Sequence, residues 1–169
     1  MDAREQLKHE MIEEFGQAYR AFGMSNLMGH IVALLIYSPH ALSLDEIKDH
    51  LRRSKGPVSQ IVRRLTDRSL IRPVWTPGSR KSFYEIEPNI FANAFNNMFV
   101  LFKNNTRIAK KLKRSLAELD DGSLEVLKSR LHEMERFYEM MEVHYQNFLN
   151  EWAEERVRLK EQKDEQTGA

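Results

Sequence analysis

The sequence contains no cysteine among its 169 residues. Disulfides, thiolate metal sites and a thiol redox switch are therefore excluded, and a cytoplasmic location is expected. No stretch approaches the roughly 18 consecutive apolar residues that a membrane-spanning helix needs, so no membrane partner is expected. The first residues lack the charged and apolar regions of a secretory signal.

Sequence signals of catalysis and of metal binding are missing as well. The chain has no glycine-rich phosphate loop and no nucleophile near a plausible base, so the sequence does not predict an enzyme. Its six histidines form no pair at the i, i+4 spacing of helical metal ligands. We therefore expect neither a metal nor another cofactor.

The charges are present in balance but are unevenly distributed along the chain. The net charge is only +1, yet residues 52–81 hold nine basic residues and one acid, and residues 103–114 hold six basic residues and no acid. A basic face on a near-neutral protein is typical of polyanion binding. Clustered charge is also common on ordinary solvated surfaces, so the order of the elements must decide between the two interpretations.

The first 40 residues predict two helices. Asp2 and Glu5 are expected to cap the first, which ends at Gly23. A stripe at helical spacing predicts its buried face, namely Leu7, Met11, Phe15, Ala18 and Phe22. The second helix begins at Ser25 or Asn26 and is apolar on nearly every side, so we expect it at the centre of the core.

Two short helices and a hairpin follow. A capping box of Ser43 and Glu46 predicts a helix to about Leu51. After a break at Arg53–Ser54, a second helix, which we expect Ser54 to cap, runs to about Ser69. Short β-type runs then flank the segment Thr76–Ser79, whose Pro-Gly centre favours a type II turn. This order is that of a winged helix-turn-helix, whose second helix enters the major groove of DNA.

The residues expected to contact DNA follow from the apolar face of that second helix. With Val58, Ile61, Val62 and Leu65 facing inward, Gln60 and Arg63 point away from the core. Arginine pairs with guanine and glutamine with adenine, so these two are the predicted base readers. The remaining residues are assigned to phosphates, to the helix N-terminus or to the wing, and the full predicted set is Ser54, Lys55, Gly56, Pro57, Ser59, Gln60, Arg63, Arg64, Arg80 and Lys81.

The C-terminal half predicts two long helices. The first covers about Asn89 to Leu119, and Asp120–Ser123 separate it from the second. An unbroken heptad from Leu124 to Trp152 is about 40 Å long at 1.5 Å per residue. A single chain has little left to cover this seam, so we predict a homodimer interface formed by Leu127, Leu131, Met134, Tyr138, Met141, Tyr145, Phe148 and Trp152.

Residues 43–88 resemble the DNA-binding head of GbsR-type regulators, a branch of the MarR superfamily. The resemblance rests on the segments SLDEI, SKGPVS and VWTPGSRKSFYEIEP and on the preceding GHIVALLIYSP, and it spans about residues 23–90. It implies a homodimer that regulates promoters and responds to a small ligand, which is choline or glycine betaine in some members. Phe22, Phe95 and Phe99 are candidates for an aromatic effector site, with ordinary core packing as the alternative.

Together these patterns predict a mainly helical fold with a small β-hairpin wing: a winged helix-turn-helix with long dimerisation helices. The expected divisions are a supporting helix (1–22), the winged helix-turn-helix (23–88), a dimerisation region (89–160) and a flexible tail (161–169). The predicted function is a homodimeric, sequence-specific transcriptional repressor that binds double-stranded DNA at a pseudo-palindromic operator. The alternative is a winged helix used for protein contact, which the excess of basic residues disfavours.

Overall fold

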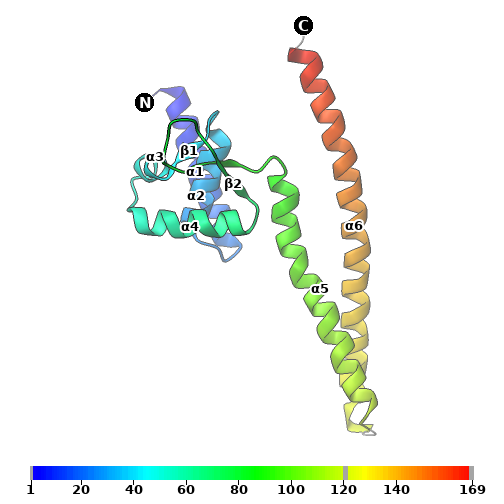
Figure 1. Ribbon diagram of the computed structural model, residues 1–169. Coiled ribbons are helices and arrows are strands. Elements are labelled where there is room, and N and C mark those ends of the chain that lie inside the picture. The colour runs from blue at the N-terminus through cyan, green and yellow to red at the C-terminus, as the bar shows by residue number, and fades with distance from the viewer. Residues whose placement is uncertain (1, 120–121, 168–169) are drawn as a thin grey trace. The chain divides into compact units, whose positions relative to one another are not determined.

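The computed structural model describes residues 2–119 and 122–167, which fall into two compact units divided between Ala94 and Phe95. The first unit contains α1 (Ala3–Ala21), α2 (Asn26–Tyr37), β1 (Leu42–Ser43), α3 (Leu44–His50), α4 (Lys55–Asp67), β2 (Ile71–Val74) and β3 (Phe83–Ile86) (Figure 1). Helix α5 (Ile90–Ala117) begins in the first unit and continues into the second, which also contains a 3₁₀ turn (Gly122–Leu124) and α6 (Glu125–Thr167). No helix among the described residues is both long and apolar enough to cross a membrane.

Helix α2 forms the centre of the first unit, as its sequence predicts. Every residue from Met28 to Leu35 is buried, and the Ser25 hydroxyl caps the helix by accepting a hydrogen bond from the Met28 amide at 3.2 Å. Helix α1 crosses α2 at a pair of glycines. A Cβ added to Gly29 would lie 2.3 Å from the Phe15 carbonyl oxygen, so the two backbones are in direct contact at this crossing.

The buried face of α1 differs from the predicted one. The crossing at Gly16 turns the face of Ile12 and Gly16 toward the core, while Leu7 and Phe22 are exposed. The Asp2 side chain makes no capping hydrogen bond. The predicted stripe was wrong at Leu7, Ala18 and Phe22, because the helix packs through Gly16 rather than through the line of apolar side chains.

A three-stranded antiparallel sheet completes the first unit, with strand order β1-β3-β2. Leu42 pairs with Tyr84 at one side of β3, and Ile71 pairs with Ile86 at the other. Strand β2 is an edge strand, which allows Pro73 to occupy it without losing a ladder hydrogen bond. The mainly helical fold with a small hairpin is therefore confirmed, and β1 is an additional strand of two residues.

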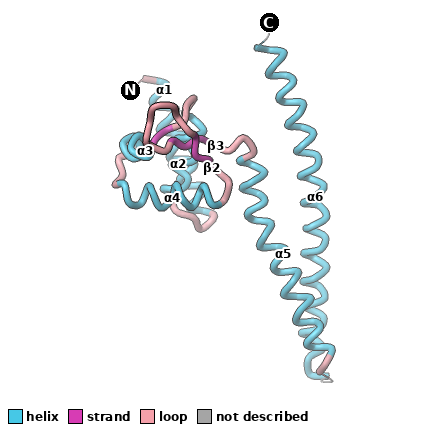
Figure 2. The backbone as a smooth tube through the Cα atoms, viewed as in Figure 1, coloured by secondary structure: helices cyan, strands magenta, loops and turns pink. Residues whose placement is uncertain are grey.

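Helices α5 and α6 pack against each other in the second unit as an antiparallel pair (Figure 2). The rings of Phe99 and Tyr145 stack with centroids 3.6 Å apart. The buried Thr106 hydroxyl donates a hydrogen bond of 2.7 Å to Glu142, and Lys110 lies 3.0 Å from Glu139. Helix α6 continues past Lys160 to Thr167, and the predicted linker residues Asp120 and Asp121 lie outside the described residues.

The packing of α5 changes the reasoning about the heptad of α6. Leu131 and Tyr145 are buried within the single chain, and Met134, Tyr138, Met141 and Trp152 are half-buried. The premise that one chain has little to cover this seam is therefore wrong. Leu127 and Phe148 remain exposed. The assignment of the seam to a dimer interface stays a prediction, and it now depends on these exposed members.

Candidate nucleic-acid interface

Helix α4 presents one apolar and one polar face. Val58, Ile61, Val62 and Leu65 are buried against the rest of the first unit. Ser59, Gln60, Arg63 and Arg64 are exposed, as the sequence pattern predicts. The residues expected to read bases therefore lie on the accessible surface of a helix that the core holds by its opposite side.

The N-terminus of α4 is open to solvent. Ser54 occupies the N-cap position, but its side chain makes no capping hydrogen bond, contrary to the expectation that it caps the helix. Lys55, Gly56 and Pro57 are exposed, and a Cβ added to Gly56 would meet no atom within 4 Å. Free amides and the positive end of the helix dipole make this terminus suitable for an anion such as a phosphate.

The hairpin between β2 and β3 carries the remaining predicted contacts. Gly78 has a φ of 76°, and the Ser79 amide donates to the Thr76 carbonyl at 3.2 Å, as a type II turn requires. Arg80 and Lys81 are both exposed just beyond this turn. Within the ladder, the Arg72 guanidinium holds the carboxylate of its cross-strand partner Glu85 at 2.6 Å, so Arg72 is not free for DNA.

Asp45 in the first turn of α3 links the two basic elements. Its carboxylate lies 3.1 Å from Lys81 Nζ on the hairpin and 3.5 Å from Lys55 Nζ at the start of α4. The hydrogen bond from Lys81 and the charge of Lys55 lower the pKa of Asp45, so it is ionised at neutral pH. No sequence pattern identified this residue in advance. Its only local signal is that it is an acid preceding a predominantly basic segment.

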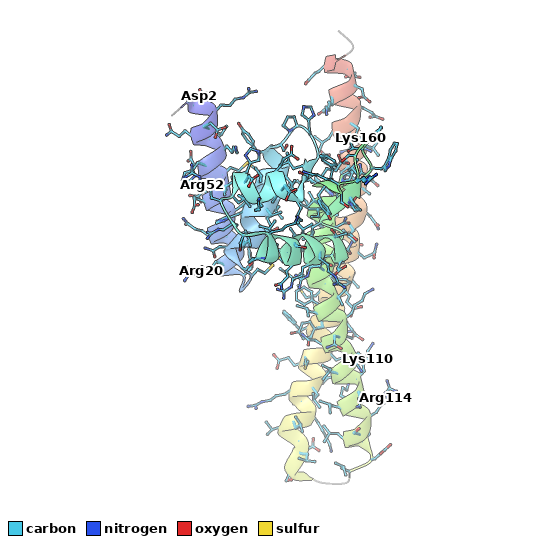
Figure 3. All side chains as sticks on the ribbon, turned by 60° about the vertical axis from the view of Figure 1, so that its left-hand side comes forward. Asp2, Arg20, Arg52, Lys110, Arg114 and Lys160 are labelled. Carbon is cyan, nitrogen blue, oxygen red and sulfur yellow. The ribbon has the colours of Figure 1, made fainter. Side chains whose placement is uncertain are left out.

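The turn between α3 and α4 has an arginine in a left-handed backbone conformation. Arg52, labelled in Figure 3, has a φ of 49°. The Arg53 amide donates to Lys48 and the Arg52 amide to Asp49, which is the hydrogen-bond pattern of a Schellman motif. Gly23 holds the same position at the end of α1, with a φ of 74°. The tight break expected at Arg53–Ser54 is thus formed one residue earlier, by Arg52.

Trp75 is another surface residue for which the sequence pattern predicted no role in binding. It directly precedes the Thr76–Ser79 turn, and 79% of it is exposed. An indole left in solvent on a hairpin is unusual, because a large apolar side chain is normally covered. Its position beside Arg80 and Lys81 in sequence makes it a candidate contact of the same surface.

The three candidate effector residues have different environments. Phe22 is exposed in the first unit. In the second unit Phe99 is buried in the stack with Tyr145, and Phe95 lies against Tyr145 and Phe148 at centroid distances of 4.7 and 5.2 Å. This is the packing that the alternative interpretation expected for Phe95 and Phe99, and an effector role for the three residues stays a prediction.

The second basic cluster is partly neutralised within its own helix pair. Lys110 and Lys113 on α5 form ion pairs with Glu139 and Glu135 on α6. These lysines serve the packing of α5 on α6, so the polyanion signal of residues 103–114 is weaker than its composition suggests. Lys103, Arg107, Lys111 and Arg114 of this cluster remain exposed, as do the basic residues of α4 and the hairpin. In the described ranges, no three His, Asp or Glu side chains form a group that could hold a metal ion.

Comparison with known proteins points to regulators with a helix-turn-helix. The chain is 26% identical over 124 residues to the HTH-type transcriptional repressor OpcR of Bacillus subtilis (strain 168), over 70% of this chain and 66% of OpcR. It is 28% identical over 125 residues to the putative HTH-type transcriptional regulator YvaV of the same organism, over 71% of this chain and 70% of YvaV. The match to OpcR thus covers slightly less than two thirds of that relative's length.

A solved structure shares the fold over nearly its whole length. It is the crystal structure of a transcriptional regulator, with a TM-score of 0.74 and 22% identity, and the match covers 87% of this chain and 98% of that one. No family model matches the chain. The chain therefore has the winged helix-turn-helix fold and is similar in sequence to HTH-type transcriptional regulators.

Proposed function

We propose that this protein is a sequence-specific DNA-binding repressor of the MarR superfamily, from its GbsR-like branch, and that it acts in the cytoplasm as a homodimer. The observation that carries the proposal is the polar face of α4. Gln60 and Arg63 are exposed there, while the opposite face is buried. A helix held in this way can enter a major groove about 12 Å wide and place both side chains against base edges.

The contacts divide into two kinds. Gln60 and Arg63 read bases, and the second group holds the phosphate backbone from the N-terminus of α4 and from the hairpin, namely Ser54, Lys55, Gly56, Pro57, Ser59, Arg64, Arg80 and Lys81. Backbone contacts fix the register of the protein on the duplex, and base contacts supply the sequence preference. The similarity to OpcR, a repressor, supports the sign of regulation.

A homodimer places two α4 helices on one operator. Two half-sites about one helical turn apart, roughly 10 bp, would match the two-fold symmetry of the pair. The exposed apolar residues of α6 support self-association, since a row of such side chains in water favours a partner; they include Val126, Phe137, Met140 and Val143. The exposed members of the heptad, Leu127 and Phe148, are part of the same proposal.

The proposal is tested by fluorescence anisotropy on the promoter of the protein's own gene and on a scrambled duplex. Arg63→Ala is expected to weaken binding to the promoter by about 1–3 kcal/mol with little effect on the scrambled duplex, because only a base contact distinguishes the two. Lys81→Ala is expected to weaken both alike and to reduce the salt dependence. Arg20→Ala, at the end of α1, is the control and should change neither. Equal losses on both duplexes for Arg63→Ala would rule out its role as a base reader.

The salt dependence also separates this function from the alternative, a winged helix used for protein contact. If about six or more phosphates are contacted, DNA affinity should fall by about a thousandfold between 50 and 200 mM salt. Binding that is indifferent to salt would favour a protein partner. Adding choline or glycine betaine in the same assay tests the effector implied by the GbsR resemblance, and release of DNA by either would support it.

A further inference from the structure

A partly open pocket of about 420 Å³ lies between α1, α2 and the turn that joins α3 to α4. Three positively charged side chains line it, those of Lys8, Arg52 and Arg53. Two carboxylates, Glu5 and Glu13, also line it and balance two of these charges. The lining therefore carries a net charge of +1, from three positive and two negative groups. Ile12 and Leu51 provide an apolar part of the wall.

Lys8 is held in an unusual position for a lysine. Only 14% of its side chain is exposed, its amine lies 3.3 Å from His50 Nδ1, and the Glu5 carboxylate is 3.6 Å away. The ion pair with Glu5 is long and the Glu5 side chain is 61% exposed, so an anion in the pocket would compete with Glu5 for the Lys8 amine.

His30 is the buried polar group of the same pocket. It is 8% exposed, and none of the described residues forms a hydrogen bond with its ring. The ring occupies the space left by Gly16, since a Cβ there would lie 2.3 Å from His30 Nε2. Burial lowers the pKa of His30, so the ring is neutral at pH 7 and can donate from one nitrogen. Among the described residues, the buried side-chain atoms left without a partner do not include the His30 nitrogens, and the ring lines the pocket, where water or a ligand can reach it.

Arg52 supplies a third, independent observation. Its left-handed backbone is strained for an L-amino acid, and glycine is the usual residue at this position of a Schellman motif. The chain uses glycine for this purpose at Gly23, whereas Arg52 and Ser69, at the end of α4, adopt the conformation as non-glycine residues. Strain of this kind often accompanies a functional residue, and Arg52 is one of the residues that line the pocket.

We propose that this pocket binds a small monocarboxylate. The carboxylate lies between Lys8 and the Arg52 guanidinium, whose planar donors fit it in a bidentate manner. His30 donates a further hydrogen bond, and the apolar body of the ligand contacts Ile12 and Leu51. A single negative charge matches the net charge of the lining.

An effect of the bound carboxylate on DNA binding would rest on the proposed DNA-binding function, whereas the carboxylate site itself does not. Arg52 and Arg53 directly precede Ser54, at the N-terminus of α4. A bound carboxylate neutralises positive charge at the end of the helix that receives phosphates. Ligand binding therefore weakens DNA binding, and DNA weakens ligand binding by the same factor.

The site is tested first without DNA, by NMR titration of the ¹⁵N-labelled full chain with hexanoate, acetate and the neutral hexanamide. Saturable shifts are expected around residues 5–13, 30 and 50–53, with hexanoate bound more tightly than acetate and hexanamide not bound. Lys8→Gln and Arg52→Gly should each weaken hexanoate binding about tenfold. Arg52→Gly is expected to fold, because glycine adopts the left-handed conformation freely.

Ser69→Gly is the matched control, since Ser69 has a φ of 53° at the end of α4 and does not line the pocket. It relieves the same strain and should leave hexanoate binding unchanged. The proposal is overturned if the folded wild-type chain shows no saturable shift, if hexanamide binds as well as hexanoate, or if Arg52→Gly binds like the wild type. Hexanoate binding that leaves DNA affinity unchanged would overturn only the regulatory consequence. Failure of DNA binding itself would leave the NMR result intact.

Discussion

Gly29 and Gly56 are both helical glycines, and their surroundings predict opposite effects of the same substitution. A Cβ at Gly29 would lie 2.3 Å from a backbone oxygen of α1, which cannot move without shifting the helix. Gly29→Ala is therefore expected to lower the free energy of unfolding by about 1–3 kcal/mol. A Cβ at Gly56 meets nothing within 4 Å, so Gly56→Ala should be neutral or stabilising by up to about 1 kcal/mol. Urea unfolding checks both, and equal effects would contradict the close crossing.

Tyr145 offers a second comparison at the scale of one side chain. Its ring stacks on Phe99, and its hydroxyl donates to Asn96 Oδ1. Tyr145→Phe keeps the stack and removes the donor, so it should cost about 1 kcal/mol of stability. Tyr138→Phe is the control, since the contact described for Tyr138 is between its ring and those of Phe102 and Phe137. Thermal unfolding that shifts equally for both variants would contradict this role of the hydrogen bond.

Side-chain burial was predicted correctly where the pattern of apolar residues is strong. The prediction failed where a specific contact between two helices decides which face is buried. The all-apolar run of α2 is buried from Met28 to Leu35, and the apolar face of α4 was predicted residue by residue. The face of α1 was not, because its position is set by contact between two glycines on different helices. A hydrophobicity pattern records apolar surface and contains no information on such a close approach.

At the scale of elements, Asp45 connects α3, α4 and the hairpin through Lys55 and Lys81. Both lysines are proposed to bind phosphates, so the Asp45 carboxylate competes with DNA for them. Asp45→Asn is expected to increase DNA affinity several-fold and to steepen its salt dependence. Both lysines can then pair with DNA phosphates, and each pairing releases counterions from the DNA.

Asp49→Asn is the matched control for that change. Asp49 lies on the same helix as Asp45, and its ion-pair partner is Lys48, at 3.0 Å. The substitution Asp49→Asn therefore removes the same charge without freeing Lys55 or Lys81. General electrostatics would raise the DNA affinity of both variants alike, so anisotropy that gives the same gain for both would refute the competition.

The pKa of Asp45 is lowered in the folded state. Its contribution to stability is therefore present above the pKa that Asp45 has in the unfolded chain, and it is lost as the pH falls through the pKa of the folded state.

The elements themselves follow from local signals. The capping box of Ser43 and Glu46 forms as predicted, with the Ser43 hydroxyl accepting from the Glu46 amide at 3.3 Å. The Pro-Gly turn is likewise encoded by four consecutive residues. Strand β1 and the Asp45 link were missed because each depends on a partner about 40 residues away in the sequence, such as Tyr84 and Lys81.

For the whole molecule, the exposed apolar residues of α6 predict self-association. Phe137→Asp is expected to raise the dimer dissociation constant at least about tenfold, or 1.4 kcal/mol, since an aspartate would be desolvated in an apolar interface. Light scattering across a dilution series measures the mass against the 20.0 kDa chain. Trp75→Asp makes the same replacement of an exposed aromatic side chain on the hairpin and should leave the mass unchanged. A monomeric wild type, or a Phe137→Asp variant as dimeric as the wild type, would contradict this use of α6.

The heptad of α6 shows what a sequence pattern can and cannot establish at this scale. It correctly predicted a long helix with one apolar seam, but it did not predict that part of the seam packs within the same chain, and the dimer interface stays a prediction. Helix α5 carries a complementary row, including Phe99, Thr106 and Ala109, which are buried in the same chain. A heptad pattern indicates that a helix packs against another helix, but whether that helix belongs to the same chain depends on the topology of the chain.

The exposed indole of Trp75 also makes the protein its own optical reporter. The chain has two tryptophans, and the other, Trp152, is half-buried on α6. In a Trp152→Phe variant, emission would come from the hairpin alone and begin at the long wavelengths of a solvated indole. Addition of duplex should quench or blue-shift that emission if the hairpin seats against a groove, and leave it unchanged if only α4 makes contact. Docking of the hairpin could then be timed separately from docking of α4, without attaching a dye.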